Sequence, residues 1–390
     1  MKNKILAIIT IVMAIAVVGL GVVMVGAAGN KDKEPATTQP IVITEPEEAE
    51  EPEEPKEPEE PSELQATLFF ASDYQEGEQG TPADNLKGIL NAVKEDKPKL
   101  DGTVFCGDYS NVSGKDNFQI TPEPAISEIE TILKDAYPDL ENDDMIFTQG
   151  NHDPLTISIN APGIHEFDDY IVYVNNTEID FPWMQGKTSG CLYKVKHTAE
   201  VMKIRFNKMI EAGEKRPIIV AQHVPLHFTA RTSSENGTGD NLYSSIVFDV
   251  VNEAAKDLNI IYVTGHNHSN GWDNYMGGSC YFKKPGDTIL IPEFDSNKTT
   301  TDSFTKEILN FTYLNAGYTG YCKSDAADNT LTGTVCEIYD NKFEFTKYSS
   351  EGVHPLSAAG AACSDPSDTD MISSENYSKE IDSPQKVERK

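Results

Sequence analysis

The stretch Gln149-Gly150-Asn151-His152-Asp153 lies just after the apolar run Met145–Phe147. An apolar run that ends in polar residues predicts a strand followed by a loop, and open α/β sheets place their chemistry at the carboxyl ends of strands. An amide, an imidazole and a carboxylate in one loop can bind a metal ion or move a proton. Asn, Gly and Asp are also ordinary turn residues, so the stretch on its own is better explained as a turn.

Four other apolar runs end in the same kinds of polar side chain. They are residues 67–71 (TLFFA) before Asp73 and Gln75, residues 103–106 (TVFC) before Asp108, residues 217–221 (PIIVA) before His223, and residues 260–263 (IIYV) before His266 and His268. Five predicted strand ends that all carry Asp, Asn or His are improbable as a coincidence. We therefore expect these loops to converge at one edge of the fold.

The five motifs, in the order SDYQ, GDYSN, GNHD, QH and GHNH, resemble those of the calcineurin-like metallophosphoesterase superfamily over residues 64–348. The resemblance implies an α/β fold, a sandwich of two mixed β-sheets flanked by helices, with two metal ions bridged by one carboxylate. It implies that Asp108 is the bridge and that His152, with Asp153, protonates the leaving oxygen. The other implied metal ligands are Asp73 and His268 for one ion, and Asn151, His223 and His266 for the other.

The residue types in these motifs suit this chemistry independently of the family. Oxygen and imidazole ligands favour divalent or trivalent ions such as Mn, Zn or Fe, and no motif contains a thiolate. Two adjacent ions can hold a phosphoryl group and lower the pKa of a bound water. His152 is the candidate general acid, because an imidazole titrates near neutral pH and the carboxylate of Asp153 would raise its pKa. We expect a metal-dependent phosphoesterase that uses two metal ions.

The first motif departs from the family pattern. It contains Asp73-Tyr74-Gln75 where the family has Asp-X-His, so a neutral amide stands where an imidazole ligand is expected. A Gln side chain can coordinate through its carbonyl oxygen, or a water molecule can take its place, and either weakens the first metal site or favours a harder ion. The alternative to an active enzyme is therefore a surface binding module that keeps the fold with little or no catalysis.

The N-terminal residues 1–30 predict a membrane anchor or a signal peptide. Lys2 and Lys4 precede a run without charges from residue 5 to residue 28, which is long enough to cross a bilayer. The run is longer than a secretory signal needs, which favours an uncleaved anchor, although Gly26-Ala27-Ala28 is small enough for cleavage. We expect a single-pass membrane protein with its catalytic domain outside the cell, or a secreted protein if the segment is cleaved.

Composition divides the rest of the chain. Residues 31–63 contain 13 Asp or Glu residues against 3 Lys, with repeated Glu-Pro units, and predict a disordered acidic linker. Residues 64–350 suit one α/β domain, and residues 351–390 are polar and are predicted to be a disordered tail. The net charge of −31 argues against nonspecific nucleic-acid binding, which needs a basic surface. The oligomeric state is left open.

The pattern of apolar residues predicts the elements between the motifs. Apolar side chains at helical spacing occur in two of four predicted helices, which span residues 85–95, 124–136, 200–212 and 244–258. Alternating patterns predict further strands at 170–174, 191–195, 288–291, 311–318, 331–339 and 342–347. Six scattered cysteines form no dense disulfide framework. Cys106 is expected to be a free core thiol, and Cys322 with Cys336 is the first pair to test for a disulfide.

The resemblance leaves the substrate open, because diesterases and monoesterases share all five motifs. A phosphodiester is favoured over a monoester, since a surface hydrolase meets nucleotides, lipid head groups and wall polymers. A monoester dianion would call for basic residues that the sequence does not place. The expected function is hydrolysis of a phosphate ester outside the cytoplasm by metal-activated water.

Overall fold

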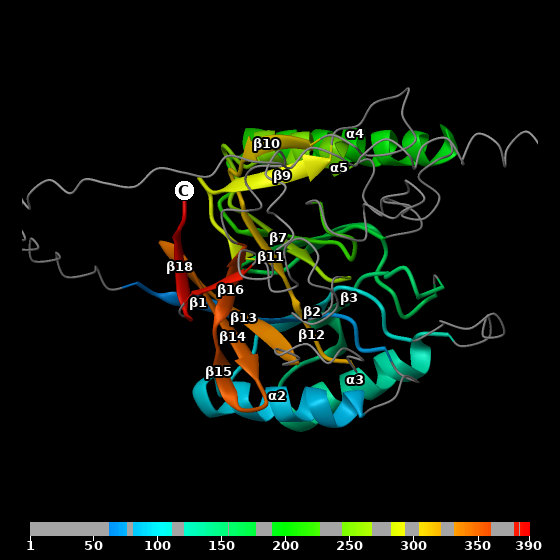
Figure 1. Cartoon of the computed structure of the whole chain (residues 1–390), viewed down its shortest axis with the longest axis vertical. Helices are drawn as coiled ribbons and strands as arrows, with labels where there is room; N and C mark the ends of the chain where they lie inside the picture. The colour runs from blue at the N-terminus through cyan, green and yellow to red at the C-terminus, as the bar shows by residue number, and fades with distance from the viewer. Residues whose placement is uncertain are drawn as a thin grey trace, which may run out of the picture. The chain divides into compact units, whose positions relative to one another are not determined.

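Two β-sheets stack face to face between two pairs of helices in the computed structural model of the chain (Figure 1). The structure describes residues 62–75, 81–110, 121–154, 156–176, 189–226, 244–266, 282–292, 304–320, 331–359, 378–381 and 383–390. All of them lie within one unit, Glu60–Lys390. The layers therefore follow the order expected of a sandwich flanked by helices.

The first sheet carries three of the five motifs. Strands β1 (Leu64–Ala71), β2 (Gly102–Phe105) and β3 (Met145–Phe147) run parallel, and β1 pairs on its other side with antiparallel β13 (Thr332–Tyr339). The sheet continues through the strands β14 (Lys342–Ser349), β15 (Gly352–His354), β12 (Gly317–Tyr318) and β18 (Gln385–Glu388). The crossover helices α2 (Pro82–Asp96) and α3 (Glu123–Ala136) cover its outer face, at the bottom of Figure 1.

The second sheet carries the other two motifs. Parallel strands β5 (Ile171–Val174), β6 (Ile218–Ala221), β7 (Ile260–Thr264) and β11 (Thr312–Asn315) form its centre. Its edges are the strands β4 (Gly163–Glu166) and β8 (Phe282–Lys283). Helices α4 (Ser189–Ala212) and α5 (Ser244–Ala254) cover its outer face at the top of Figure 1, together with the hairpin of β9 (Thr288–Pro292) and β10 (Phe304–Ile308).

The strands alternate between core layers, as the pleat of a β-strand requires. In β1, Leu68 and Phe70 join the apolar cluster between the two sheets, whereas Phe69 and Ala71 join the cluster under α2 and α3. A third cluster fills the space between the second sheet and helices α4 and α5. Both faces of the central strands are therefore buried, which explains why their sequences are almost continuously apolar.

Most predicted elements are confirmed. All five motif strands are present, as are the four predicted helices and the hairpin of β13 and β14. The run 311–318 is split into β11 and β12, and Cys106 is a buried free thiol as expected.

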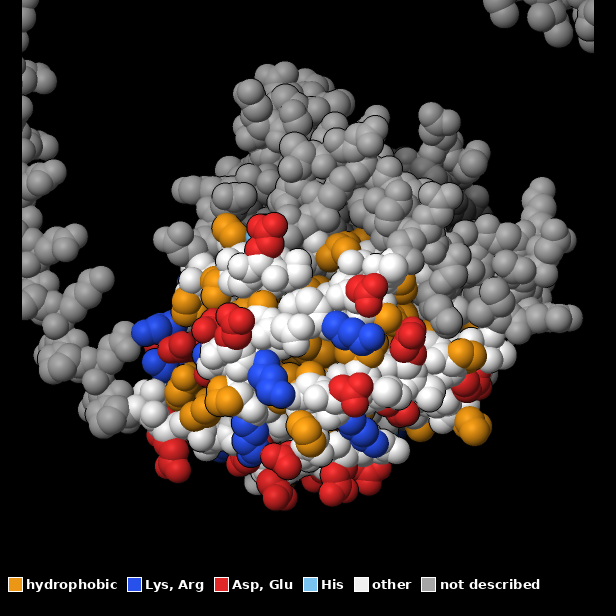
Figure 2. Space-filling model, turned by 90° about the horizontal axis from the view of Figure 1, so that it is seen from below, with side chains coloured by type: hydrophobic (Ala, Val, Ile, Leu, Met, Phe, Trp, Pro, Cys, Tyr) orange, Lys and Arg blue, Asp and Glu red, His pale blue; other side chains and the backbone are white. Residues whose placement is uncertain are grey.

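Figure 2 shows the surface of the domain from below, on the side of α2 and α3. Acidic and basic side chains are mixed over the described residues of this face.

The prediction of a strand at 191–195 is wrong, because these residues belong to the first turns of α4. The run Cys-Leu-Tyr-Lys-Val alternates apolar and polar residues, which matched a strand pattern locally. Val195, Met202, Phe206 and Met209 continue the apolar face at helical spacing and pack into the cluster under α4. The longer helical period therefore overrides the local alternation.

The tail also differs from the prediction of disorder across 351–390. Residues 352–359 and 378–388 contribute four short strands, of which β18 pairs with β14. Val387 is 7% exposed and joins Phe343 and Phe345 in the core between the sheets. One inward-facing valine in a polar segment was too weak a signal to predict this strand. Cys336 is a buried free thiol, so the suggested disulfide with Cys322 is not formed.

Within the described residues no helix is both long enough and apolar enough to cross a bilayer. The predicted anchor at 1–30 and the acidic linker up to residue 61 lie outside the described residues. The anchor and the linker therefore remain predictions.

Replacing Val387 with Ala is expected to lower the free energy of unfolding by about 1.5 kcal/mol, because two buried methyl groups are removed from the core. Urea denaturation of the full-length protein measures this loss. Glu388→Ala, at the exposed neighbouring position, is the matched control and should leave the midpoint unchanged. Equal midpoints for the two variants would contradict the docking of β18.

Candidate metal centre

Five predicted ligands follow five strand ends directly. Asp73 follows β1, Asp108 follows β2, Asn151 follows β3, His223 follows β6 and His266 follows β7. Parallel strands bring their carboxyl ends to the same edge of a sheet, and stacking brings the edges of the two sheets together. The sequence therefore places oxygen and imidazole ligands from both sheets at one edge of the sandwich.

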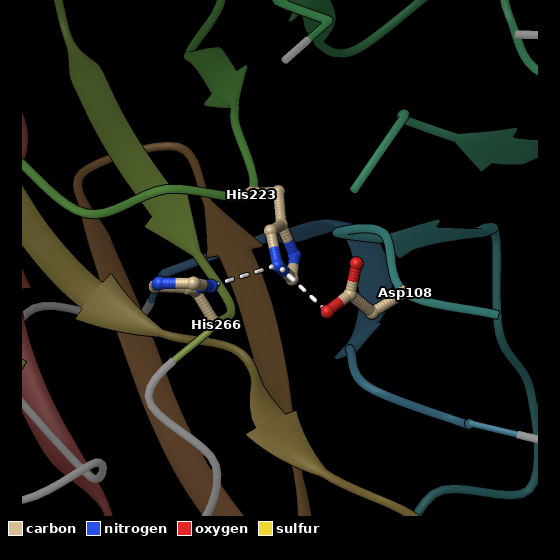
Figure 3. A group of neighbouring side chains, drawn as sticks. All are labelled: Asp108, His223 and His266. Carbon is tan, nitrogen blue, oxygen red and sulfur yellow. Dashed lines mark hydrogen bonds and ion pairs between the residues drawn. The ribbon is translucent and has the colours of Figure 1, made fainter. Parts of the chain in front are cut away.

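Three of these side chains meet in a buried cluster (Figure 3). One ligand atom from each of Asp108, His223 and His266 lies within 4.8 Å of the others. The imidazole of His223 lies between the other two, with its Nε2 3.1 Å from Oδ2 of Asp108 and 3.3 Å from Nδ1 of His266. Asn151 adds its Oδ1 at 2.9 Å from the same Nε2. Three predicted ligands therefore converge around one nitrogen of a fourth, His223.

A backbone carbonyl fixes the orientation of His223. Its Nδ1 lies 2.5 Å from the carbonyl oxygen of Cys106, which accepts a hydrogen bond and so requires a proton on Nδ1. In the neutral imidazole this leaves the lone pair on Nε2, which faces the cluster. A carbonyl that holds the second ring nitrogen is a common feature of histidine metal ligands.

The donor set fits a metal ion. Oδ2 of Asp108 is fully buried and accepts no hydrogen bond from the described residues. Its ion-pair contact, at 3.1 Å, is with Nε2 of His223, which Oδ1 of Asn151 also faces. Buried lone pairs that converge in this way repel each other unless a proton or a cation lies between them. Oxygen and imidazole donors suit Zn, Mn or Fe. Asp73 lies close by, since its Oδ2 accepts a hydrogen bond from the backbone N–H of His266.

The backbone of the ligand loops is strained. Among the described residues, four non-glycine positions have a left-handed φ, namely Asp73 (54°), Gln75 (51°), Asp108 (59°) and His266 (70°). All four were predicted as metal ligands from the sequence. Such residues cost free energy and collect at functional sites, where the surrounding structure holds them in place. The strain is therefore independent support for a site here.

Gly150 allows the second and third loops to come together. A Cβ atom on Gly150 would lie 2.1 Å from Oδ1 of Asp108 and 2.2 Å from its backbone nitrogen. No larger residue fits without displacing Asp108. The glycine of the GNHD motif therefore serves close packing against the central carboxylate.

The structure gives Asp153 a role that differs from the prediction. Its carboxylate accepts backbone hydrogen bonds from Asp108 (2.7 Å), Tyr109 (2.9 Å) and Gly150 (2.9 Å), with a longer one from Ser110. It makes no hydrogen bond to His152 within the described residues. The expectation that Asp153 acts directly with His152 is therefore corrected, because this carboxylate ties the second loop to the third.

His152 is placed at the rim of the cluster. Its side chain is 28% exposed, and its Nε2 lies 3.9 Å from Oδ2 of Asp108. Its backbone N–H donates to Oδ1 of Asp108 at 2.9 Å. The imidazole therefore has access both to solvent and to the buried ligands.

Two further predicted ligands are Gln75 and His268, of which the structure describes the first. Gln75 is 3% exposed, and its backbone N–H donates to the carbonyl of Asp108, so the first loop is bonded to the second. His268 lies outside the described residues, so its role as a ligand remains a prediction.

Sequence reasoning missed the supporting residues of the loops. The hydroxyl of Tyr109 lies within hydrogen-bond distance of the carbonyl oxygens of Phe105 (2.9 Å) and Thr148 (2.7 Å), which share its one proton, and the hydroxyl of Ser72 donates to the carbonyl of Cys106. Tyr109 and Ser72 each adjoin a predicted ligand in the sequence, which is the one signal that could have identified them.

The buried charges shift each other's pKa values. Burial alone would raise the pKa of Asp108, but the charges of His223 and His152 hold it well below its usual value. Burial alone would lower the pKa of His223, but Asp108 and Asp73 raise it to about 9. Burial and the charge of Asp108 raise the pKa of Asp153 to about 7. Without a metal ion, a second proton on His223 therefore balances the charge of Asp108.

Metal binding is expected to displace this proton, because a histidine ligand must be neutral. At pH 7 the metal-free protein should release about one proton from His223 per protein molecule when the metal centre fills, and the release should vanish as the pH rises through about 9. The raised pKa also stabilises the metal-free fold below pH 6.5, and this contribution is lost as the pH rises through 9. Titration calorimetry with Zn²⁺ in buffers of different ionisation enthalpy counts the protons.

The matched variants are His223→Asn and His165→Asn. His165 lies outside the cluster and bonds to the carbonyl of Ala161, so its replacement should leave the proton count unchanged. The His223 variant should bind without releasing this proton. Release of the same number of protons by both variants would contradict the assignment.

Comparison with known proteins places this geometry in a family. A family model described as calcineurin-like phosphoesterase matches residues 67–270, which is more than half of the chain. No curated protein matched the sequence. Three similar solved structures are a dimetal phosphatase from Danio rerio, a purple acid phosphatase, PPD1, from yellow lupin (Lupinus luteus) seeds, and a Vps29 variant from Entamoeba histolytica.

These structures are distant in sequence. The zebrafish phosphatase is 8% identical, with a TM-score of 0.45, over 75% of this chain and 98% of that chain. The lupin enzyme is 10% identical, with a TM-score of 0.41, over 74% and 52%. The Vps29 variant is 10% identical, with a TM-score of 0.29, over 73% and 92%. The match of the family model, which ends after the last motif, shows that the chain belongs to the calcineurin-like phosphoesterases and is a metal-dependent hydrolase of phosphate esters.

Proposed function

We propose that the chain is an extracytoplasmic phosphoesterase with a dinuclear metal centre. The observation that carries the proposal is the buried cluster of Asp108, His223 and His266, in which Oδ2 of Asp108 accepts no hydrogen bond from the part of the chain that the structure describes. Asp73 and Asn151 extend the same cluster on either side, through the hydrogen bonds described above. The metals are divalent or trivalent ions, with Mn, Zn or Fe favoured by the ligand types.

Different residues of the chain have different roles in the proposed reaction. Asp73, Gln75, Asp108, Asn151, His223, His266 and His268 would hold the metal ions. When bound, two such ions supply Lewis acidity toward the phosphoryl group and a water nucleophile at neutral pH. His152 donates a proton to the leaving oxygen, which suits its partly exposed position 3.9 Å from Asp108. Asp153 acts indirectly, by fixing the loops that carry Asp108 and Asn151.

A phosphodiester is the favoured substrate class. Asp108 forms its ion pairs with His223 and His152 rather than with Lys or Arg. A diester carries one negative charge, whereas a monoester dianion carries two and needs more cationic compensation. The charge of the described site therefore suits the diester better.

The proposal also places the catalytic domain outside the cytoplasm. The apolar run within residues 1–30, behind Lys2 and Lys4, supports a single-pass anchor with the catalytic domain outside the cell. The acidic residues 31–63 would act as a spacer between the membrane and the domain. Cleavage within residues 26–28 would instead release a secreted enzyme.

A second candidate function rests on Gln75. This residue stands in place of the histidine of the family pattern, which would weaken one of the two metal sites. With one metal retained, the domain would bind a phosphate ester at the cell surface without turning it over. Metal stoichiometry and turnover separate this binding protein from the enzyme.

Hydrolysis of bis(p-nitrophenyl) phosphate by the full-length protein in detergent tests the proposal. The protein is stripped of metal and reloaded with Mn²⁺ or Zn²⁺, and p-nitrophenyl phosphate serves as the monoester. Turnover should depend on metal and be faster with the diester. Asp108→Asn should abolish it, because the central carboxylate is lost, and His165→Ala should match the wild type.

The role of His152 is tested by the leaving group. His152→Ala should slow hydrolysis of glycerophosphocholine by about 10²–10⁴-fold, because its alkoxide must be protonated on departure. The loss should be smaller with p-nitrophenyl esters, whose leaving group needs little protonation. No turnover of any ester despite bound metal would favour the binding protein, and Gln75→His would then be the variant expected to restore activity.

A further inference from the structure

A second cavity lies away from the metal cluster, between β4, β5 and the N-terminal half of α4. Its volume is about 320 Å³, which is enough for a small organic molecule. Its lining includes Gly163, Tyr173, Asn175, Tyr193, His197 and Arg205. No predicted metal ligand contributes to it.

The pleat of β5 separates the cavity from the metal cluster. Val172 and Val174 face the core between the two sheets, whereas Ile171 and Tyr173 face the core under α4. Asn175 lies on the same side of β5 as Ile171 and Tyr173, and its Nδ2 lies 3.7 Å from the Sδ of Met202 on α4. The cavity therefore lies on the outer face of the second sheet, the face that α4 covers in Figure 1.

Arg205 supplies a positive charge to this cavity. Its half-buried guanidinium lies 5.4 Å from the ring centroid of Tyr173 and donates to the Tyr173 hydroxyl at 3.2 Å. No carboxylate of the described residues pairs with it, although the chain contains 63 acidic and 32 basic residues. Partly buried arginines are normally paired, and their planar N–H groups bind carboxylate or phosphate. Arg205 is therefore prepared to bind an anion.

Gly163 lets Arg205 approach the sheet. Its φ is +125°, and a Cβ atom there would lie 2.6 Å from Nη1 of Arg205. A larger residue would push the guanidinium away from Tyr173. The backbone of β4 is therefore shaped around this charge.

Asn175 supplies an unsatisfied acceptor. The residue is 1% exposed, and its Nδ2 donates to Oε1 of Gln222 at 3.2 Å, but among the described residues its Oδ1 accepts no hydrogen bond. A buried acceptor without a donor costs about 1–3 kcal/mol, so such atoms usually have a partner. A hydroxyl or amine of a ligand in the cavity would provide one.

The rim adds an aromatic surface. Tyr193 is 71% exposed, and its ring is parallel to that of His197, at 6.3 Å between centroids and an angle of 7°. Lys194 lies beside them in the lining. A cationic and aromatic rim over a buried acceptor suits a small polar anion better than an apolar molecule.

We propose that this cavity binds a small hydroxylated organic anion, with its anionic group on Arg205 and a hydroxyl donating to Oδ1 of Asn175. The site is separate from the catalytic one, since none of the predicted metal ligands lines this cavity. The anionic group is a phosphate or a carboxylate, because the guanidinium fork fits both.

Titration calorimetry on the full-length, metal-free protein in detergent with excess chelator tests this site. The probes are glycerol 3-phosphate, glycerate and propyl phosphate, which lacks free hydroxyl groups. Glycerol 3-phosphate should bind at least about fivefold more tightly than propyl phosphate, because only the former satisfies Asn175. Binding of glycerate would show that a carboxylate suffices, whereas binding of glycerol 3-phosphate alone would identify the group as a phosphate.

Arg205→Gln should weaken binding about tenfold or more, because a charged hydrogen-bond donor is lost. Lys208→Gln, at an exposed position on the same helix, is the matched charge control and should bind as the wild type does. Arg205→Lys keeps the charge without the planar fork, so it should bind severalfold more weakly and replaces Arg205→Gln if that variant does not fold.

Three results would overturn the proposal. They are the absence of binding by all three probes, unchanged binding by a folded Arg205 variant, and equal affinity of the wild type for glycerol 3-phosphate and propyl phosphate. The last comparison needs no variant, so a folding defect cannot obscure it.

Discussion

The contact between Asp108 and His223 joins the two sheets at the site. Asp108 comes from the first sheet and His223 from the second, and both side chains are fully buried with Oδ2 and Nε2 3.1 Å apart. A buried charge is costly unless a partner compensates it, so each residue depends on the other. The stacking of the two sheets thus brings together the pair in which the charge of Asp108 is balanced by a proton on His223 or by a metal ion.

The surrounding loops are built to hold this pair. Asp153 receives backbone N–H groups from both the second and the third loop, and Gly150 leaves room for the carboxylate of Asp108. The strained backbone at Asp73, Gln75, Asp108 and His266 is held in place by hydrogen bonds between the loops. The free energy gained in the large buried core on either side offsets this local strain.

The sequence predicted the strands and ligand types well, because five buried strands end in Asp, Asn or His. It failed where a local pattern competes with a longer one, as at residues 191–195, or where a single side chain decides, as Val387 does. The hydrogen bonds of Asp153 could not be predicted, since they join loops that are distant in sequence. The cavity at Arg205 was also missed, because its residues come from β4, β5 and α4 and form no motif.

The metal cluster and the cavity at Arg205 differ in the charged groups that they contain. The metal cluster at the carboxyl edge gathers a carboxylate and two imidazoles, whereas the cavity on the outer face offers a guanidinium and a buried amide oxygen. Gln222 lies between them, since its side chain bonds to Asn175 and it directly precedes His223. Residues at the carboxyl edge of this sheet therefore contribute both to the metal cluster and to the cavity at Arg205.

Anomalous diffraction from crystals soaked in Mn²⁺ tests the metal centre most directly. Two peaks are expected about 3.5–4 Å apart, with the carboxylate of Asp108 between them and Nε2 of His223 directed at one of them. A single peak, or peaks remote from Asp108, would contradict a dinuclear centre at this edge of the sandwich.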